Sequence, residues 1–375
     1  MERAVHLSML PSLHAAMQSS ISAVAACAVA ISAVTLSRAY FASCGQHLLR
    51  VCNAALAEGL RWRSREGALY FSDMHAGKVV KLAPGSAPET VLTIDADDPS
   101  GLGWLPDGRL LLVRMLSRSL AAWDPATREL VAYADLSSIQ PLKSNDLCVD
   151  CDGNAYVGGF GLNDPDVGDD NKAAHETSEV TLVRPPAAGA AQRVETAASG
   201  ILFPNGTVIT PDGRTMIVAE TFGARLTAWE RDLTSARLSS PRCWAELPGC
   251  YPDGMCLDAE GAVWVAICAT QLANRLRSRA ATLLAYVRAG QPTGAVCRVH
   301  EGGRISQCIF LADSMAVACM LGGADGRTLY VSCAASTVAA TCKAAGTSNG
   351  YVGIVRVAVP AATADSCRDY WGGCC

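Results

Sequence analysis

Residues 203–223, with the sequence FPNGTVITPDGRTMIVAETFG, contain the pattern that decides the fold. A run of apolar and β-branched residues leads into Asp212-Gly213, and a second such run, RTMIVAE, follows at once. Asp-Gly between two strand-forming runs predicts a tight antiparallel hairpin, because glycine readily adopts the positive φ that the turn requires.

The hairpin pattern recurs along the chain. An Asp-Gly or Glu-Gly turn precedes a strand-like run six times, with the glycine at positions 67, 108, 153, 213, 261 and 326. Each hairpin is followed, after a loop of variable length, by a further alternating run such as KVVKLAP (78–84). Repeats of this kind stack radially as blades. The sequence therefore predicts an all-β fold, a six-bladed β-propeller with four-stranded antiparallel blades, in which HLLRVC (47–52) completes the last blade.

The two ends of the chain differ from the repeats. No acidic residue occurs between positions 2 and 58, and residues 21–36 form an Ala- and Val-rich stretch. This stretch is short for a membrane span and is typical of a secretory signal or an organelle transit segment, although a disordered leader on a cytoplasmic protein is the alternative. We expect a leader at 1–46, the propeller at 47–360 and a Cys-containing tail at 361–375.

Composition narrows the range of partners. The 375 residues include 31 basic and 35 acidic side chains, and the net charge is −4. The basic residues are too thinly spread for a phosphate backbone, so we expect a small-molecule substrate, no nucleic acid and no stable membrane insertion of the propeller. No feature indicates an oligomeric state. The 17 cysteines are irregularly spaced and predict neither a disulfide framework nor a zinc site, and the internal pair Cys148 and Cys151 has no second pair to match it.

Polar residues recur near the start of the first strand of each repeat. In a propeller this strand lines the central channel, so equivalent positions form a ring at one end of it. These positions lie eight residues before the turn glycine, or nine in the first repeat, and hold Glu58, Ser100, Asn145, Asn205, Asp253 and Ala318. Four of the six are carboxylates or carboxamides, and no arginine stands in the ring.

Buried groups of this kind are costly unless they are paired or coordinated. A hard cation held by Glu58, Asn205 and Asp253, with Asn145 close by and water completing the shell, would satisfy them. Carboxylate, amide oxygen and water suit Ca²⁺, Mg²⁺ or Mn²⁺, whereas Zn²⁺ favours His or Cys. The alternative is that these residues only cap strands and turns.

Four segments, in order and in register with the repeats, resemble the regucalcin, gluconolactonase and luciferin-regenerating enzyme family. The resemblance covers residues 56–360 and implies a six-bladed propeller with one catalytic divalent metal, Ca²⁺ first, held by Glu58, Asn205 and Asp253. It also places Asn145 near the metal or the substrate. The segments are AEGLRW (57–62), KSNDLCVDCDGNAYVG (143–158), FPNGTVITPDGRTMIVAETFG (203–223) and YPDGMCLDAEGAVWVA (251–266).

Two positions depart from the family pattern. Leu60 stands where the family usually has proline, and Lys143 stands where some members place an arginine that contacts sugar lactones. Lys143 is therefore a candidate substrate-binding residue, but the change argues against carrying over a sugar substrate.

Connections between the second and third strands should return to the metal end of the channel and could select the substrate. They comprise residues 162–179, 267–294 and 334–349 and the short segment Met74-His75-Ala76. Leucines at roughly helical spacing predict a helix within 267–294. His75, in the shortest of these connections, is a candidate substrate contact, or merely an exposed loop residue.

These features favour a metal-dependent hydrolase of a lactone or related ester. A bound cation would polarise the carbonyl, and Asp253 would act as general base on water or as an electrostatic partner. The sequence contains no GxSxG elbow between a strand and a helix, because its one GxSxG stretch, at 346–350, leads into a strand-like run instead. The four family segments also contain no histidine, and both observations argue against a Ser-His-Asp mechanism. A phosphotriesterase-like hydrolase and a non-catalytic calcium-binding or interaction propeller are the alternatives.

Overall fold

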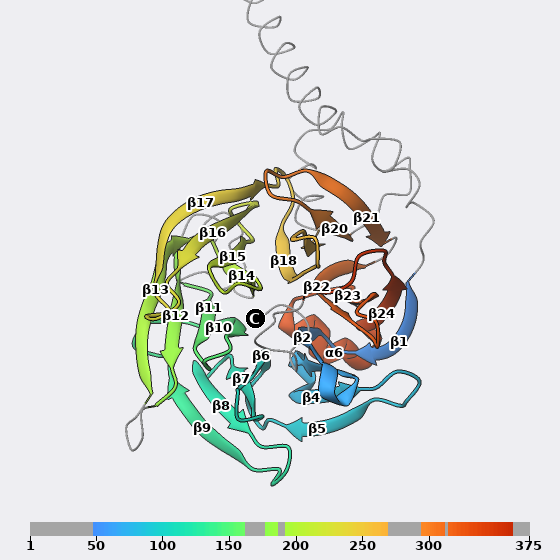
Figure 1. Ribbon diagram of the computed structural model, residues 1–375. Coiled ribbons are helices and arrows are strands. Elements are labelled where there is room, and N and C mark those ends of the chain that lie inside the picture. Colours follow the sequence, from blue (N-terminus) through green and yellow to red (C-terminus); the bar gives the residue numbers. More distant parts are fainter. Residues whose placement is uncertain (1–47, 162–176, 187–191, 269–293, 312–313, 363–375) are drawn as a thin grey trace, which may run out of the picture.

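The computed structural model describes residues 48–161, 177–186, 192–268, 294–311 and 314–362. Within them, six four-stranded antiparallel sheets stand radially around one central axis (Figure 1). In five of the six sheets the innermost strand comes first along the chain and the following strands lie progressively further out. The predicted six-bladed β-propeller is therefore confirmed.

The strand bounds follow the repeat pattern. Blades 1 to 3 consist of β2 (Ala57–Arg63), β3 (Ala68–Asp73), β4 (Lys78–Leu82) and β5 (Glu89–Thr93); β6 (Pro99–Trp104), β7 (Leu110–Arg114), β8 (Ser119–Trp123) and β9 (Leu130–Asp135); and β10 (Ser144–Val149), β11 (Ala155–Gly159), β12 (Ser178–Arg184) and β13 (Arg193–Ile201). Blades 4 and 5 consist of β14 (Pro204–Ile209), β15 (Thr215–Glu220), β16 (Arg225–Arg231) and β17 (Leu238–Glu246); and β18 (Pro252–Leu257), β19 (Val263–Cys268), β20 (Gly294–Val299) and β21 (Ile305–Leu311).

Blade 6 joins the two ends of the described chain. Its inner strands are β22 (Met315–Gly322), β23 (Thr328–Ala334) and β24 (Gly350–Arg356), and its outer strand is β1 (Leu49–Ala54). β1 runs antiparallel to β24, with Leu49 opposite Ile354 and Ala54 opposite Gly350. The predicted closing strand is thus confirmed, and pairing it protects an edge that would otherwise be open.

All six predicted turns join the first and second strands of a blade. In blade 4, Gly213 has a φ of 72°, and the Asp212 carboxylate accepts a hydrogen bond of 3.1 Å from the backbone N–H of Arg214. The other five turn glycines also have positive φ. A side chain at these positions would be strained, which explains why glycine recurs there.

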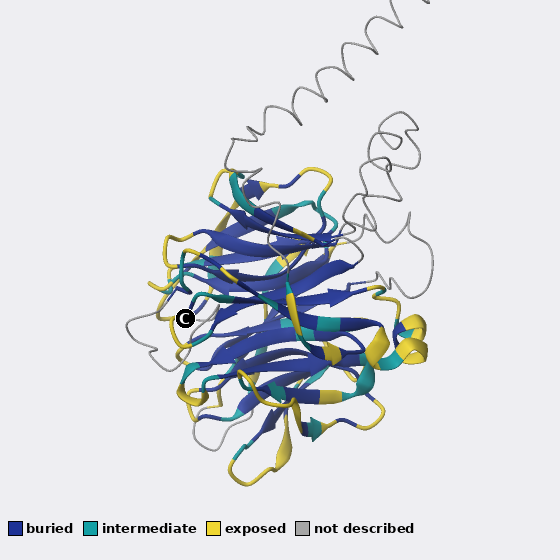
Figure 2. Cartoon of the chain, turned by 90° about the vertical axis from the view of Figure 1, so that its right-hand side faces the viewer, coloured by how far each residue is buried: buried dark blue, intermediate teal, exposed yellow. Residues whose placement is uncertain are grey.

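Apolar side chains fill the spaces between blades. Figure 2 shows that the strands are buried while the connecting loops carry most of the exposed residues. Between blades 1 and 2, the rings of Tyr70 and Trp104 meet edge to face at 5.0 Å between centroids, and the Arg63 guanidinium lies 3.4 Å from the Trp104 ring centroid. Stacking the blades thus buries faces that no single blade could bury.

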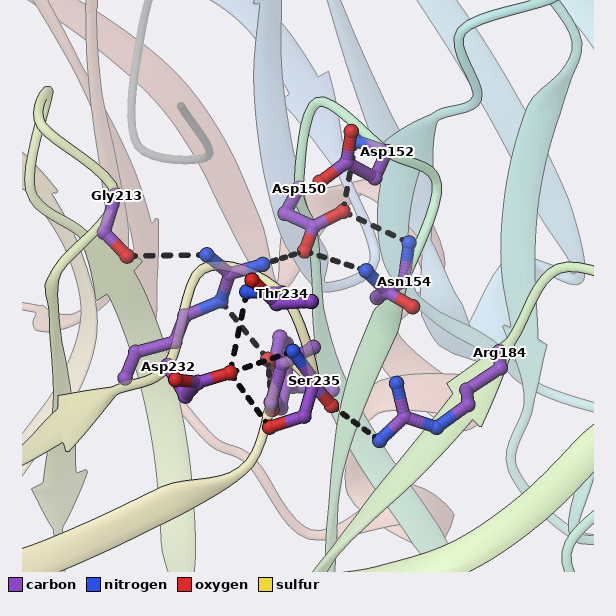
Figure 3. Close-up of polar contacts among 11 residues, drawn as sticks. Asp150, Asp152, Asn154, Arg184, Gly213, Asp232, Thr234 and Ser235 are labelled. Carbon is purple, nitrogen blue, oxygen red and sulfur yellow. Dashed lines mark hydrogen bonds and ion pairs between the residues drawn. The ribbon is translucent and has the colours of Figure 1, made fainter.

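Polar networks at the turn end of the channel tie neighbouring blades together (Figure 3). Asp150, after β10, accepts hydrogen bonds from the backbone N–H groups of Asp152 (2.9 Å) and Asn154 (2.8 Å) and from the Asn154 side chain. The same carboxylate pairs with Arg231 of blade 4. These buried charges are therefore matched within the fold.

Three features differ from the expectations or lie beyond the description. A disulfide joins Cys297 on β20 to Cys308 on β21, although the cysteine spacing predicted no such bridge. The connection after β23 contains a short helix, α6 (Ala339–Ala345), and a 3-10 turn, η4 (Gly346–Ser348), which had not been predicted. β19 continues to Cys268 and β20 begins at Gly294, so the expected insert helix, like the expected leader and most of the tail, lies outside the described residues.

Candidate functional site

The inner strands approach one another closely at the end of the channel opposite the turns. Glycine follows four of the polar ring residues, Glu58, Ser100, Asn205 and Asp253, and it allows this contact. A Cβ on Gly59 would lie 2.6 Å from the Ser100 carbonyl oxygen, and a Cβ on Gly206 would lie 2.5 Å from the Asp253 carbonyl oxygen. No side chain fits such gaps, so the motif glycines bring neighbouring ring residues together.

Four of the six ring positions line one pocket of about 370 Å³ at this end of the channel. They are the four predicted oxygen donors, Glu58, Asn145, Asn205 and Asp253. Ser100 and Ala318 are buried but are not among the residues that line it. The repeat argument therefore selected a set of residues that the fold does bring together.

Asp253 is 8% exposed and lies at the start of β18. Burial is the main cause that raises the pKa of its carboxyl to about 7, and the charge of Asp146 raises it further. The Cys268 thiol, 3.3 Å from Asp253 Oδ2, opposes the rise by hydrogen bonding. Burial and the neighbouring carboxylate also raise the pKa of that thiol, which keeps it protonated as a donor.

Asn205 is held by its amide nitrogen. Asn205 Nδ2 donates to Thr221 Oγ1 at 3.2 Å, and the Thr221 hydroxyl in turn donates to the Pro252 carbonyl oxygen at 2.8 Å. A hydrogen bond from Asn205 also lowers the pKa of Asp253, which identifies the amide as a donor to that carboxylate. These bonds use the nitrogen, so the amide oxygen is the atom suited to accept or to coordinate.

Glu58 belongs to blade 1 and is partly exposed to the pocket. Burial raises the pKa of its carboxyl well above the ordinary value, and the charges of Asp253 and Asp146 add to the rise. The Gly59 N–H and Arg61 act in the opposite direction. Two carboxyls from blades 1 and 5 therefore repel each other across the channel, which is the condition that a bound cation relieves.

The sequence pattern did not predict an ion pair that lies next to the ring of polar residues. Arg61, three residues further along β2, donates to Asp146 Oδ1 at 3.3 Å and to the Leu147 carbonyl oxygen. It thereby connects blade 1 with blade 3 past the inner strand of blade 2. Because the two residues occupy different positions in their repeats, comparison of equivalent positions could not reveal them.

His75 lies in the 3-10 turn η2 (Met74–Ala76) and lines the pocket. Its side chain is only 5% exposed, and Nδ1 is 3.2 Å from Asp98 Oδ2. Lys343 of α6 reaches the same carboxylate at 3.4 Å. His75 is thus a buried and oriented side chain rather than a merely exposed loop residue.

Lys143 stands apart from the other candidates. It is not among the residues that line the pocket. Its ammonium lies 5.8 Å from the ring centroid of Phe160, and Phe160 does line the pocket. The backbone N–H of Phe160 also donates to the Lys143 carbonyl oxygen at 2.9 Å. A direct contact between Lys143 and a substrate remains a prediction.

The donor set at the base of the pocket is compatible with a hard cation. In the described part of the chain, no three His, Cys, Asp or Glu side chains are grouped so as to hold a metal ion. A cation there would therefore need the Asn205 amide oxygen and water in addition to the carboxylates of Glu58 and Asp253. That mixture of carboxylate, amide and water oxygens is one that Ca²⁺ accepts.

Fold and pocket together define a six-bladed propeller with a polar site at one end of its channel. Residues 56–335 match the family described as the SMP-30/Gluconolactonase/LRE-like region. The chain belongs to this family, as the sequence motifs had indicated. None of the helices in the described ranges is long and apolar enough to cross a membrane.

Solved structures show the same fold at low sequence identity. A luciferin-regenerating enzyme aligns with 85% of this chain and 98% of its own, with a TM-score of 0.63 and 18% identity. The calcium-binding protein regucalcin from Agrobacterium tumefaciens aligns with 83% of this chain and 93% of its own (TM-score 0.62, 19% identity). A gluconolactonase from Xanthomonas campestris aligns with 84% and 89% (TM-score 0.60, 20% identity). No curated protein matches the sequence.

Proposed function

We propose that this protein is a metal-dependent hydrolase of lactones or related esters. The observation that carries the proposal is the meeting of Glu58, Asn205 and Asp253, from three different blades, at the base of one pocket. Membership of the family supports the same class of reaction, since one structural relative is described as a gluconolactonase. A purely structural role would not require two carboxyls with raised pKa values at the base of a pocket.

In the proposed site, Glu58, Asn205 and Asp253 would hold one divalent cation, with Ca²⁺ the first candidate and Mn²⁺, Mg²⁺ or Zn²⁺ as others. When bound, the cation supplies a Lewis acid that polarises the substrate carbonyl and stabilises negative charge on its oxygen. The protein contributes the orientation of the three oxygen donors, and the Thr221 hydrogen bond fixes which end of the Asn205 amide faces the pocket.

Asp253 is the proposed general base. It accepts a proton from the water that attacks the carbonyl carbon, and the bond from that carbon to the ring oxygen then breaks. The departing ring oxygen takes the proton back from the Asp253 carboxyl, which yields a hydroxy acid and restores the carboxylate. A pKa of about 7 suits both transfers near neutral pH.

Asn145 and His75 are proposed to contact the substrate above this centre. Both line the pocket, and Asp98 holds the His75 ring from behind through Nδ1. The other ring nitrogen is then available to the pocket as a hydrogen-bonding group. We expect His75→Asn to change substrate preference while leaving hydrolysis itself intact.

The proposal is tested by hydrolysis of lactones, aryl esters and phosphotriesters before and after EDTA, and after addition of Ca²⁺, Mn²⁺ or Zn²⁺. We expect lactone hydrolysis to be lost in EDTA and restored by one of these ions. Asp253→Ala should lower turnover by at least about a hundredfold, whereas Asp212→Ala, in an exposed turn at the opposite end, should not.

Other outcomes would distinguish the alternatives. Activity that survives both chelation and Asp253→Ala would place the catalytic centre elsewhere. A preference for phosphotriesters would favour a phosphotriesterase-like enzyme, and cation binding without turnover of any substrate would favour a binding propeller.

A further inference from the structure

The wall of the pocket differs chemically from its base. Whereas the base carries carboxylates and amides, every blade contributes a large apolar or aromatic side chain above it. One from each blade, in order, is Met74, Met115, Phe160, Phe203, Tyr251 and Met315. These six belong to one buried apolar cluster.

The aromatic members form a continuous arc over blades 3 to 5. Ring centroids are 4.7 Å apart between Phe160 and Phe203, 4.9 Å between Phe203 and Phe222, and 6.4 Å between Phe222 and Tyr251. Methionines occupy the wall on blades 1, 2 and 6. A rigid aromatic surface therefore faces side chains that adapt readily to different apolar shapes.

The backbone at the centre of this arc is strained. Phe203 has a φ of 61°, the left-handed region that non-glycine residues, and aromatic residues especially, rarely adopt. The conformation is held by the hydrogen bond from the Thr221 N–H to the Phe203 carbonyl oxygen at 3.1 Å. It places the ring between Phe160 and Phe222 in the pocket wall. Strain of this kind is commonly retained where it positions a functional group.

The described polar groups on the wall are few. They are the side chains of His75, Thr221, Ser336 and Thr337 and the hydroxyl of Tyr251. The Thr221 hydroxyl is already engaged with Pro252 and Asn205, and Ser336 Oγ accepts from the Val338 N–H at 3.1 Å. A polyhydroxylated ring entering this pocket would lose hydrogen bonds to water that the phenylalanine and methionine side chains cannot replace.

We infer that the substrate is a lactone bearing an alkyl or aryl substituent, whose apolar part lies against the Phe160–Phe203–Phe222 arc while the lactone carbonyl faces the ring of polar residues. This inference rests on the proposed hydrolase function. It assigns the wall a separate task, which is to favour apolar over polyhydroxylated substrates.

The test uses lactones that share a six-membered ring: δ-valerolactone, δ-hexalactone, δ-decalactone and D-glucono-1,5-lactone. We expect kcat/KM to rise from the unsubstituted ring to the pentyl-substituted δ-decalactone by at least about tenfold, since each buried methylene contributes up to about fourfold. We expect D-glucono-1,5-lactone to be the poorest of the four. If it is instead the best, the substrate class is wrong although the proposed reaction stands.

The variant Phe203→Asn tests the wall itself. Asparagine tolerates a positive φ, so the substitution removes apolar surface without demanding a new backbone conformation. We expect it to lower kcat/KM for δ-decalactone much more than for δ-valerolactone, so that the preference between the two lactones is lost. Phe310→Asn is the matched control, because Phe310 lies on β21 with 37% exposure and outside the pocket lining. An unchanged preference in Phe203→Asn would overturn the inference.

A binding measurement separates the two proposals. Calorimetric titration with 3-pentylcyclohexanone, which cannot be hydrolysed, should show binding at least about tenfold tighter than with cyclohexanone. The difference should shrink in Phe203→Asn and persist in Phe310→Asn. If no lactone is hydrolysed but this difference is found, the hydrolase function fails while the apolar site stands. Equal binding of both ketones would refute the apolar site.

Discussion

The two ends of strand β18 each carry a buried aspartate in a different environment. Asp258, at the turn end, is 1% exposed and is bonded by Arg298 Nε at 2.6 Å and by the backbone N–H of Glu260 at 2.9 Å. Asp253, at the pocket end, has a pKa raised by burial and by a neighbouring carboxylate. A buried acid whose negative charge is compensated by a cation and by hydrogen-bond donors has a structural role. A buried acid without such compensation has a raised pKa and is a candidate for catalysis or cation binding.

The same contrast appears along β10. Asp150, at its turn end, accepts hydrogen bonds from the backbone of the turn that follows it (Figure 3) and forms an ion pair with Arg231. At its other end Asn145 faces the pocket. Polar residues therefore recur at both ends of the inner strands, but their surroundings divide them into two classes. The predictions below test that division.

The largest effect on stability is expected at the turn end. Asp258→Ala should lower the free energy of unfolding by about 3–5 kcal/mol, because it leaves the Arg298 guanidinium without its buried partner. Denaturant unfolding would measure the change. Asp212→Ala, which removes an exposed turn carboxylate, is the control and should cost less than about 1 kcal/mol. Equal losses in the two variants would contradict the assignment of Asp258 to structure.

A smaller effect is expected in the pH dependence of cation affinity. Coordination requires Glu58 and Asp253 as carboxylates, and both pKa values are raised, that of Asp253 to about 7. Protons must then leave when a cation binds, so affinity for Ca²⁺ should fall by about tenfold for each pH unit below 7. Titrations at pH 6, 7 and 8 would measure it. An affinity that is constant over this range would show that neither carboxyl is a ligand.

The smallest effect concerns the stability of the cation-free protein. A carboxyl whose pKa is raised by folding binds more protons folded than unfolded. The stability that it contributes is therefore lost as pH rises from about 4 to about 7. Asp253→Asn should remove this slope and stabilise the protein at pH 8 in EDTA by at least about 1 kcal/mol. Thermal unfolding of both proteins would measure the difference, and a destabilised variant would assign Asp253 to the structural class.

The repeat pattern predicted the fold and the ring because equivalent positions in a repeat occupy equivalent places in space. The turn glycines, the closing strand and the convergence of Glu58, Asn205 and Asp253 at one pocket all followed from that rule. The apolar wall could have been found in the same way, since Met74, Met115 and Phe160 each directly follow the second strand of a blade.

Other features depend on contacts that the repeats do not encode. The Arg61–Asp146 ion pair joins different repeat positions in blades 1 and 3, and Asp98 reaches His75 from the connection before β6. The Cys297–Cys308 disulfide depends on the register of β20 and β21, which cysteine spacing does not reveal. Such partners are chosen by tertiary packing rather than by periodicity.

Calorimetric titration of the EDTA-treated protein with Ca²⁺ tests the central claim, that the ring holds a cation, most directly. We predict one Ca²⁺ per chain, with binding abolished or weakened by at least about a hundredfold in Glu58→Gln and in Asp253→Asn, and retained in Asp212→Ala. Binding of Ca²⁺ with unchanged affinity and stoichiometry in Glu58→Gln and Asp253→Asn would contradict the account, as would the absence of binding of Ca²⁺, Mn²⁺ and Zn²⁺ to the wild-type protein.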